Sequence, residues 1–194
     1  MKTKKKRLRI FFILLVILIA VLLIFFFGNR KEKIRHQVRP TGVAQATKPA
    51  KTVQMKKITL FFLSENDNLL HPEEREIQAS SSVNEEAKEV IEELIKGPKS
   101  GLLPSIPENT RVRQVFVTSD GVAYVDLSRA VLEATYYGST GEMAVVYSIV
   151  NSLAYNFKAI KKVSLLVEGN ERETLGGHID LTQPFSPDYS LIAR

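Results

Sequence analysis

The stretch TRVRQVFVTSDGVAYVDL, residues 110–127, carries the plainest structural signal in this chain of 194 residues. Two runs rich in β-branched and aromatic residues, 110–118 and 122–127, flank the triplet Ser119-Asp120-Gly121. An Asp-Gly pair between two such runs is typical of a β-hairpin, because glycine readily adopts the positive φ that a tight turn needs. The stretch therefore predicts two antiparallel strands.

The segment after the hairpin predicts a helix and then another strand. Ser139-x-x-Glu142 is a candidate capping box, in which the two side chains bond free N–H groups at a helix start. Apolar residues then recur at helical spacing and form the clearest amphipathic stripe in the chain: Met143, Val146, Tyr147, Val150, Leu153, Ala154 and Phe157. Residues 162–167 have the composition of a strand, and residues 178–181 could add a short edge strand.

The segment before the hairpin predicts a strand, a weaker strand and a helix. Residues 57–63 are β-branched and aromatic and stop at a turn-forming cluster, so they predict a buried strand. Residues 73–79 could form a short, more polar strand. A second candidate capping box, Ser82-x-x-Glu85, opens a helix that Gly97-Pro98 ends. This order predicts an α+β fold, with a mixed β-sheet and two main helices packed on one face.

The N-terminal part of the chain predicts a membrane anchor. Residues 10–27 form an unbroken apolar run of 18 residues, which as a helix spans roughly 27 Å, close to the thickness of a hydrocarbon core. The run ends without the small-residue cleavage site of a signal peptide, which favours an uncleaved anchor. We therefore expect a basic N-terminal segment at 1–9, a transmembrane helix at 10–28, a flexible basic linker at 29–55, the α+β domain at 56–187 and a C-terminal tail at 188–194.

The positive charge of the chain belongs to the predicted tether. Residues 1–57 contain 15 Lys and Arg against the single acid Glu32, a net +14, whereas residues 58–194 contain 12 Lys and Arg against 20 Asp and Glu, a net −8. An acidic domain argues against a nucleic-acid partner, because nucleic-acid binding depends on clustered cations. The denser run of cations before the anchor predicts a cytoplasmic N-terminus, so the lipid bilayer is crossed once and the domain lies outside the cytoplasm.

Few residues suggest catalysis. The chain has no cysteine, and none of its three histidines lies in a recognisable catalytic or metal-binding motif. His178 follows Gly176-Gly177, whose backbone N–H groups could bind an anion, although a diglycine more often provides unusual backbone angles. Asp126 interrupts the apolar end of a strand and is either a functional carboxylate or, more often, a turn or capping residue. We predict no enzyme activity, no cofactor and no metal site.

Pairs of tyrosines and of glutamates are the remaining candidates for a site. Tyr136-Tyr137 precedes the second helix in a predicted loop, where exposed rings suit contact with a partner. Three glutamate pairs could suggest acid–base chemistry, but a solvated surface explains them better: Glu73-Glu74, Glu85-Glu86 and Glu92-Glu93. The candidate interaction residues are therefore Tyr136, Tyr137, Asp126, Gly177 and His178.

Several short motifs occur in a characteristic order between residues 57 and 185. They are Glu93-Leu94-Ile95-x-Gly97-Pro98, Ser105-Ile106-Pro107, Gly121-x-x-x-Val125-Asp126-Leu127-Ser128, Ile149-Val150-x-Ser152-Leu153, Val163–Val167 closed by Gly169, and Leu175-Gly176-Gly177-His178-Ile179-Asp180 before Pro184-Phe185. Together they resemble the GerMN domain, a family named for sporulation and spore germination proteins. The resemblance implies a non-catalytic envelope module, lipidated or membrane-anchored, with an assembly or ligand-binding role. This chain differs from the family prototype in having one domain copy, and an apolar anchor in place of a lipidated cysteine.

The expected function is that of a membrane-anchored interaction module outside the cytoplasm. It would dock with an envelope protein or with another copy of itself in a cell-envelope assembly, in sporulation, in germination or in a general envelope role. A rival hypothesis is a module that binds or cleaves cell-wall glycan. That hypothesis requires Asp126, Glu142 and His178 to converge in one cleft.

Overall fold

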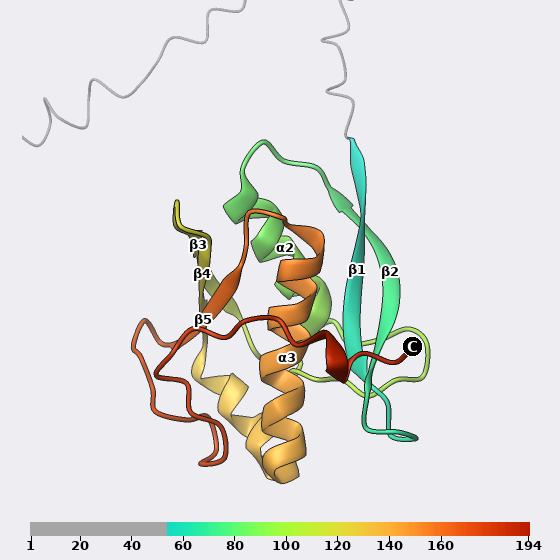
Figure 1. The fold of residues 1–194 in the computed structure, drawn as a ribbon, viewed down its shortest axis with the longest axis vertical. Helices are drawn as coiled ribbons and strands as arrows, with labels where there is room; N and C mark the ends of the chain where they lie inside the picture. Colours follow the sequence, from blue (N-terminus) through green and yellow to red (C-terminus); the bar gives the residue numbers. More distant parts are fainter. Residues whose placement is uncertain (1–53) are drawn as a thin grey trace, which may run out of the picture. The chain divides into compact units, whose positions relative to one another are not determined.

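The structure, a computed structural model, describes residues 54–194 apart from the side chains of residues 134–137 (Figure 1). The elements of this part of the chain are β1 (Met55–Leu63), β2 (Leu70–Gln78), α2 (Val83–Ile95), β3 (Val112–Val117), β4 (Val122–Leu127), the 3-10 helix η1 (Arg129–Tyr137), α3 (Gly138–Asn156), β5 (Lys162–Val167) and the 3-10 helix η2 (Tyr189–Leu191). The α+β class and the hairpin at Gly121, which has a φ of 93°, are confirmed. The Ser82 cap of α2 is also confirmed, because its hydroxyl accepts the N–H of Glu85 at 3.4 Å.

The strands form two separate sheets. One is the antiparallel pair β1–β2, and the other has the order β3-β4-β5, with β3 antiparallel and β5 parallel to β4. Figure 1 shows α2 and α3 between the two sheets, and each helix contacts strands of both. The prediction of a single mixed sheet with both helices on one face is therefore wrong, although the mixed pairing itself occurs in the three-stranded sheet.

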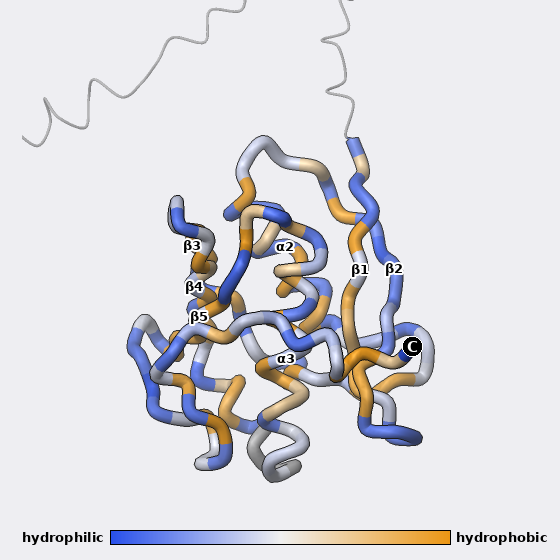
Figure 2. Tube along the Cα trace, in the orientation of Figure 1, coloured by the Kyte–Doolittle hydropathy of each residue, from blue (hydrophilic) through white to orange (hydrophobic). Residues whose placement is uncertain are grey.

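The second edge of β1 explains why the two sheets stay apart. The Thr59 N–H donates to Oδ1 of Asn156 at 2.9 Å, and the Phe61 N–H donates to Oγ of Ser152 at 3.1 Å. Both acceptors are side chains of α3, so a helix occupies the edge where another strand would pair. Figure 2 shows the contrast within this sheet: β1 is hydrophobic over most of its length, whereas β2 is largely hydrophilic.

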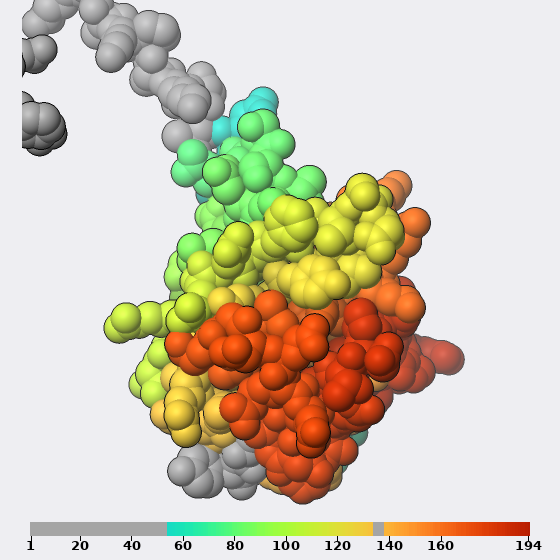
Figure 3. Space-filling model, turned by 90° about the vertical axis from the view of Figure 1, so that its left-hand side faces the viewer, coloured from blue at the N-terminus to red at the C-terminus, as the bar shows by residue number. Residues whose placement is uncertain are grey.

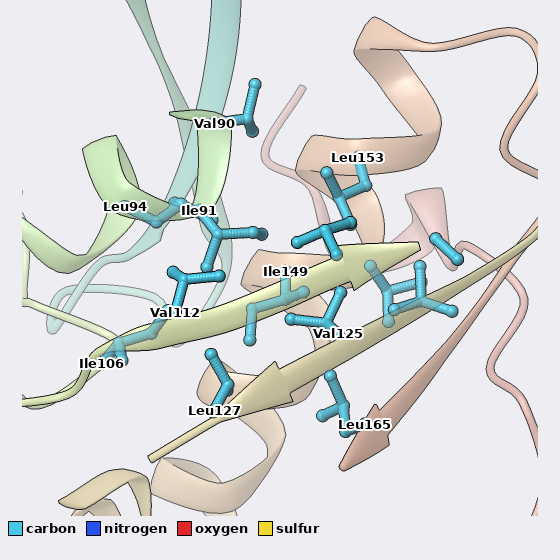
Figure 4. Packing of buried hydrophobic residues seen from close by; sticks show 14 of the residues in the cluster. Val90, Ile91, Leu94, Ile106, Val112, Val125, Leu127, Ile149, Leu153 and Leu165 are labelled. Carbon is cyan, nitrogen blue, oxygen red and sulfur yellow. The ribbon is translucent and has the colours of Figure 1, made fainter. Parts of the chain in front are cut away.

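The main core lies between the helices and the three-stranded sheet (Figure 4). Ile91 and Leu94 of α2 meet Ile149 and Leu153 of α3 above Val125 of β4, and none of the five is exposed. α3 is buried on most of its circumference, including four polar residues outside the predicted stripe: Glu142, Ser148, Asn151 and Ser152. The prediction that α3 is the most amphipathic element is wrong, because a helix between two sheets has little surface facing water.

The C-terminal segment packs on the body of the domain. Residues 178–181 do not form the expected edge strand; instead Phe185 pairs with Val163 at the free edge of β5. In the last segment, Asp188 bonds Asn151 of α3, and Ile192 and Ala193 meet Leu70, the first residue of β2. The predicted anchor at 10–28 lies outside the described residues, as do residues 1–9 and 29–53. Within residues 54–194, no helix has both the length and the apolar character needed to cross a bilayer.

Candidate functional site

Glu142, one turn into α3, is fully buried and holds the loop of residues 174–179. Its Oε1 accepts the N–H of Leu175 at 2.9 Å, and its Oε2 accepts the N–H of His178 at 2.9 Å. The same Oε2 lies 3.1 Å from Nδ1 of the His178 ring. The predicted capping box with Ser139 is therefore wrong: the chain enters α3 directly from η1, and the carboxylate of Glu142 serves a distant loop.

The surroundings of Glu142 keep it ionised. Burial raises the pKa of its carboxyl, but the backbone N–H groups of Gly176, His178, Leu175 and Ile179 outweigh burial and hold the pKa below its ordinary value. Several N–H groups pointing at one carboxylate form an anion-binding nest. The anion in this nest belongs to the protein's own helix.

Gly177 and His178 combine both roles that the sequence suggested for the diglycine. Gly177 has a φ of 95°, and its N–H donates to Oγ1 of Thr174 at 3.0 Å, which closes the turn. Backbone N–H groups of the same loop bind the carboxylate of Glu142. The His178 side chain is 44% exposed, so its ring caps the buried carboxylate while one side faces water.

Asp126 belongs to a separate cluster. Its neighbours Val125 and Leu127 are buried against the helices, so strand alternation places Asp126 on the outer face of the three-stranded sheet. Its Oδ2 pairs with Nε of Arg113 at 2.9 Å, and its Oδ1 accepts the N–H of Gly169 at 2.8 Å. Among the described residues, no hydrogen bond or ion pair links Asp126 to Glu142 or His178. The single cleft that the glycan-enzyme hypothesis requires is not formed by these three groups.

The two tyrosines are placed only by their backbone. Tyr136 and Tyr137 end η1 immediately before α3, so they lie in a 3-10 helix and not in the predicted loop. Their side chains are outside the part of the chain that the structure describes, and their predicted role in partner contact stays a prediction.

The sequence predicts that all three glutamate pairs are solvated, but only one member of each pair is exposed. In each pair one member is exposed and the other packs inward: Glu73, Glu86 and Glu93 face the domain. Glu73 and Glu93 both pair with Arg75, whose side chain is only 3% exposed. Glu86 pairs with Nζ of Lys56 at 2.5 Å. These glutamates hold β1, β2 and α2 together, which gives them a structural task.

A row of polar residues on α3 was missed by sequence reasoning. Ser148 bonds Ser105 at 2.8 Å, and Asn151 bonds both the N–H and the C=O of Asp188. Ser152 and Asn156 continue the row toward β1. Ser148, Ser152 and Asn156 recur every four residues, and Asn151 lies three residues after Ser148, so this periodicity in the sequence could have indicated a polar contact face.

The outer face of the three-stranded sheet exposes apolar side chains. Phe116 of β3 is 50% exposed and stands opposite Tyr124 of β4, which is half-buried. Leu166 of β5, diagonal to Tyr124, is half-buried as well. Figure 3 looks toward this side of the domain, where residues 110–127 form the upper part of the surface and residues 165–185 the lower part. We call the surface formed by Phe116, Tyr124 and Leu166 the outer sheet face.

Known proteins of similar sequence and structure fall in one group. The family model "Germane: Sporulation and spore germination" matches residues 59–173. A predicted lipoprotein from Clostridium perfringens is 24% identical, with a TM-score of 0.50 over 68% of this chain and 87% of that chain. The tandem GerMN domains of the sporulation protein GerM from Bacillus subtilis are 23% identical, with a TM-score of 0.57 over 69% of this chain and 46% of that chain.

The first GerMN domain of GerM taken alone is 24% identical, with a TM-score of 0.51 over 69% of this chain and 96% of that domain. This chain thus matches slightly less than half of the tandem protein and nearly all of its single domain. At these identities the solved structures establish a shared fold alone. No curated protein matches this chain.

Proposed function

Since the chain belongs to the Germane family of sporulation and spore germination proteins, we propose that it is a membrane-tethered, non-catalytic docking module of the cell envelope. The anchor at residues 10–28 holds it in the cytoplasmic membrane, and the domain lies outside the cytoplasm. Its task is to bind another envelope protein in an assembly. The family description links such modules to sporulation and spore germination. The partner protein would determine in which of these assemblies this chain takes part.

The outer sheet face is the observation that carries this proposal. Parallel strands such as β4 and β5 are usually covered on both faces, yet within residues 54–194 both helices lie on the inner face only. Phe116, half exposed, has Tyr124 directly opposite it. Exposed aromatic side chains beside half-buried apolar ones are typical of the centre of a protein interface.

The polar groups around this face support docking over chemistry. Beside it, Arg113 bridges two carboxylates: its Nε donates to Oδ2 of Asp126 at 2.9 Å and its Nη1 donates to Oε2 of Glu168 at 2.6 Å. Glu142 is likewise saturated by the 174–179 loop. Polar groups that bond to one another in this way hold the surface more rigid, and a rigid surface loses less entropy when it binds.

The charge of the domain favours a partner different from itself. Residues 58–194 carry a net charge of −8, so two copies repel each other, whereas a partner with an apolar patch edged by cations is attracted. We therefore place the partner among envelope proteins with a cationic rim around an apolar surface. A second copy of this chain is the alternative outcome of the experiment below.

Site-specific crosslinking in intact cells tests the docking face. A photoreactive residue in place of Phe116 should capture one envelope protein, while the same residue in place of Glu74, exposed on β2 of the other sheet, should not. Capture of the chain by itself would replace the partner with a second copy. Equal capture from both positions, or no protein captured from Phe116, would overturn the proposal.

Topology is tested separately with reporter fusions at Arg194. A reporter that is active only outside the cytoplasm should be active in this fusion, and one that requires the cytosol should be silent. The opposite pattern would place the domain in the cytoplasm and would exclude an extracytoplasmic docking role.

A further inference from the structure

The outer sheet face belongs to a strand–helix–strand unit. β4 and β5 are parallel neighbours, and η1 and α3 connect them. In folds built from such units, helices usually bury the strands on both faces. Within residues 54–194, α2 and α3 both lie on the inner face of the three-stranded sheet (Figure 1). The outer sheet face therefore lacks the helix layer that a sheet of this kind usually has.

The β5 edge of this sheet is closed to an extended segment of a partner. Val163 exchanges two backbone hydrogen bonds with Phe185, and Val167 exchanges two with Asn170. Backbone groups point to one edge at every second residue. Among the described residues, Leu165 is thus the one position of this edge left between the two closed ones.

The β3 edge is interrupted as well. The N–H of Val117 donates to Oδ1 of Asn84 at 3.0 Å, so α2 closes the end of the strand. The pairing register of β3 shifts between Val112 and Gln114, and such irregularities turn an edge away from further pairing. Strand addition depends on a run of backbone bonds. In the described part of the chain neither edge of this sheet offers one, so a partner has to bind the face through side chains.

The dimensions of the face match those of one helix. Neighbouring strands lie about 4.8 Å apart, so the outer two of three strands are roughly 10 Å apart, about the diameter of a helix. Strands of six residues are about 20 Å long, the length of a helix of about 13 residues. Tyr124 lies opposite Phe116, and Leu166 lies diagonally from Tyr124. The three side chains form an oblique row, along which the apolar stripe of a helix can pack.

We propose that the partner binds the outer sheet face with an amphipathic α-helix, which supplies the missing layer of the fold. The inference rests on the proposed docking function and names the element by which the partner makes contact. The apolar stripe of this helix packs along Phe116, Tyr124 and Leu166. Because residues 58–194 carry a net charge of −8, lysines and arginines beside the stripe favour binding.

The spacing of crosslinks along the partner tests this proposal. A photoreactive residue is placed in turn at Phe116, Tyr124 and Leu166 of the full chain in intact cells, and mass spectrometry locates the captured residue of the partner each time. A helix should give capture sites in one segment, about three, four or seven residues apart. Glu74, exposed on β2, is the control position and should capture none of these sites.

A synthetic peptide with the sequence of the captured segment gives a second measurement. Its binding partner is the fragment of residues 54–194, which holds both hydrophobic clusters of the described chain and should fold without the anchor. The peptide should gain helical circular dichroism when it binds. Proline in its middle, at a position facing water, should weaken binding about a hundredfold relative to alanine, because proline breaks a helix.

The possible outcomes separate this inference from the proposed function. Capture sites two residues apart would indicate an added strand, and sites in separate segments would indicate a second sheet stacked on the face. Either result, or equal binding of the proline and alanine peptides, would overturn the helix and leave the docking face in place. Capture at none of the three positions would overturn both the helix and the docking function.

Discussion

Replacing Glu142 by Gln should release the 174–179 loop from α3. Hydrogen bonds to a charged acceptor contribute about 1.5–3 kcal/mol each, and the Glu142 carboxylate accepts two from backbone N–H groups, of Leu175 and His178. Gln keeps one acceptor oxygen, but its NH₂ group then faces an N–H donor. Removal of a buried charge offsets part of this loss. We expect the free energy of unfolding at pH 7 to fall by about 2–4 kcal/mol.

The pH dependence of this loss has a definite sign. The pKa of Glu142 is lowered in the folded protein, because backbone N–H groups favour the carboxylate more than burial disfavours it. Its contribution is therefore complete above the ordinary pKa of a glutamate and disappears as the pH falls through the lowered value. The difference between the native protein and Glu142→Gln should shrink as the pH is taken from 7 toward 3.

Urea unfolding of residues 54–194 at several pH values measures this difference, and hydrogen exchange locates it. The amides of Leu175 and His178 should exchange faster in the variant, while those of the β1–β2 sheet change less. Glu171→Gln, on an exposed residue of the same connection, serves as the matched control. The reasoning fails if the two variants are equally stable at pH 7, or if their difference grows in acid.

Three further substitutions test other parts of the fold. Thr110→Val should raise stability by about 1 kcal/mol in thermal unfolding, because the hydroxyl of Thr110 is buried without a partner among the described residues; a lower melting temperature would refute this. Asn156→Ala should lower the free energy of unfolding in urea by about 2 kcal/mol, since it leaves the N–H and C=O of Thr59 unpaired; an unchanged urea midpoint would show that Asn156 does not stabilise the free edge of β1. Gly121→Ala should cost about 1–3 kcal/mol, because a Cβ at φ 93° would lie 2.8 Å from the carbonyl oxygen of Ala159, and retained stability would contradict the turn geometry.

Local signals in the sequence predicted the local parts of the fold. The Asp120-Gly121 pair and its flanking apolar runs determine a hairpin over a few residues, and Ser82 caps α2 from three residues away. Both depend on backbone geometry and short-range hydrogen bonds, which a sequence window contains. The same is true of the positive φ at Gly177.

The features that the sequence did not predict depend on residues that are far apart in the chain. Ser139-x-x-Glu142 fits a capping box, but the same carboxylate also fits a nest of N–H groups that lies 33 to 36 residues further along the chain. The division into two sheets depends on Ser152 and Asn156 reaching β1 across more than ninety residues. A window of sequence shows that these residues are polar but not which backbone groups they meet. In the same way, the sequence does not show that Asp126 and Glu142 belong to different sites. The structure shows it, because strand alternation places Asp126 on the outer face of the sheet.

The bonds between β1 and α3 impose an order on folding. Asn156 and Thr59 are 97 residues apart, so β1 cannot acquire its second hydrogen-bonded edge until the whole of α3 has been synthesised. Until then β1 is an apolar strand whose backbone N–H and C=O groups are unpaired along one edge, and such edges readily pair with another chain. The polar, glutamate-rich β2 lies directly after it and can cover one side early through a short turn. A domain built this way completes its first strand late, when α3 docks onto β1, and until then β2 protects the one edge of β1 that is already paired.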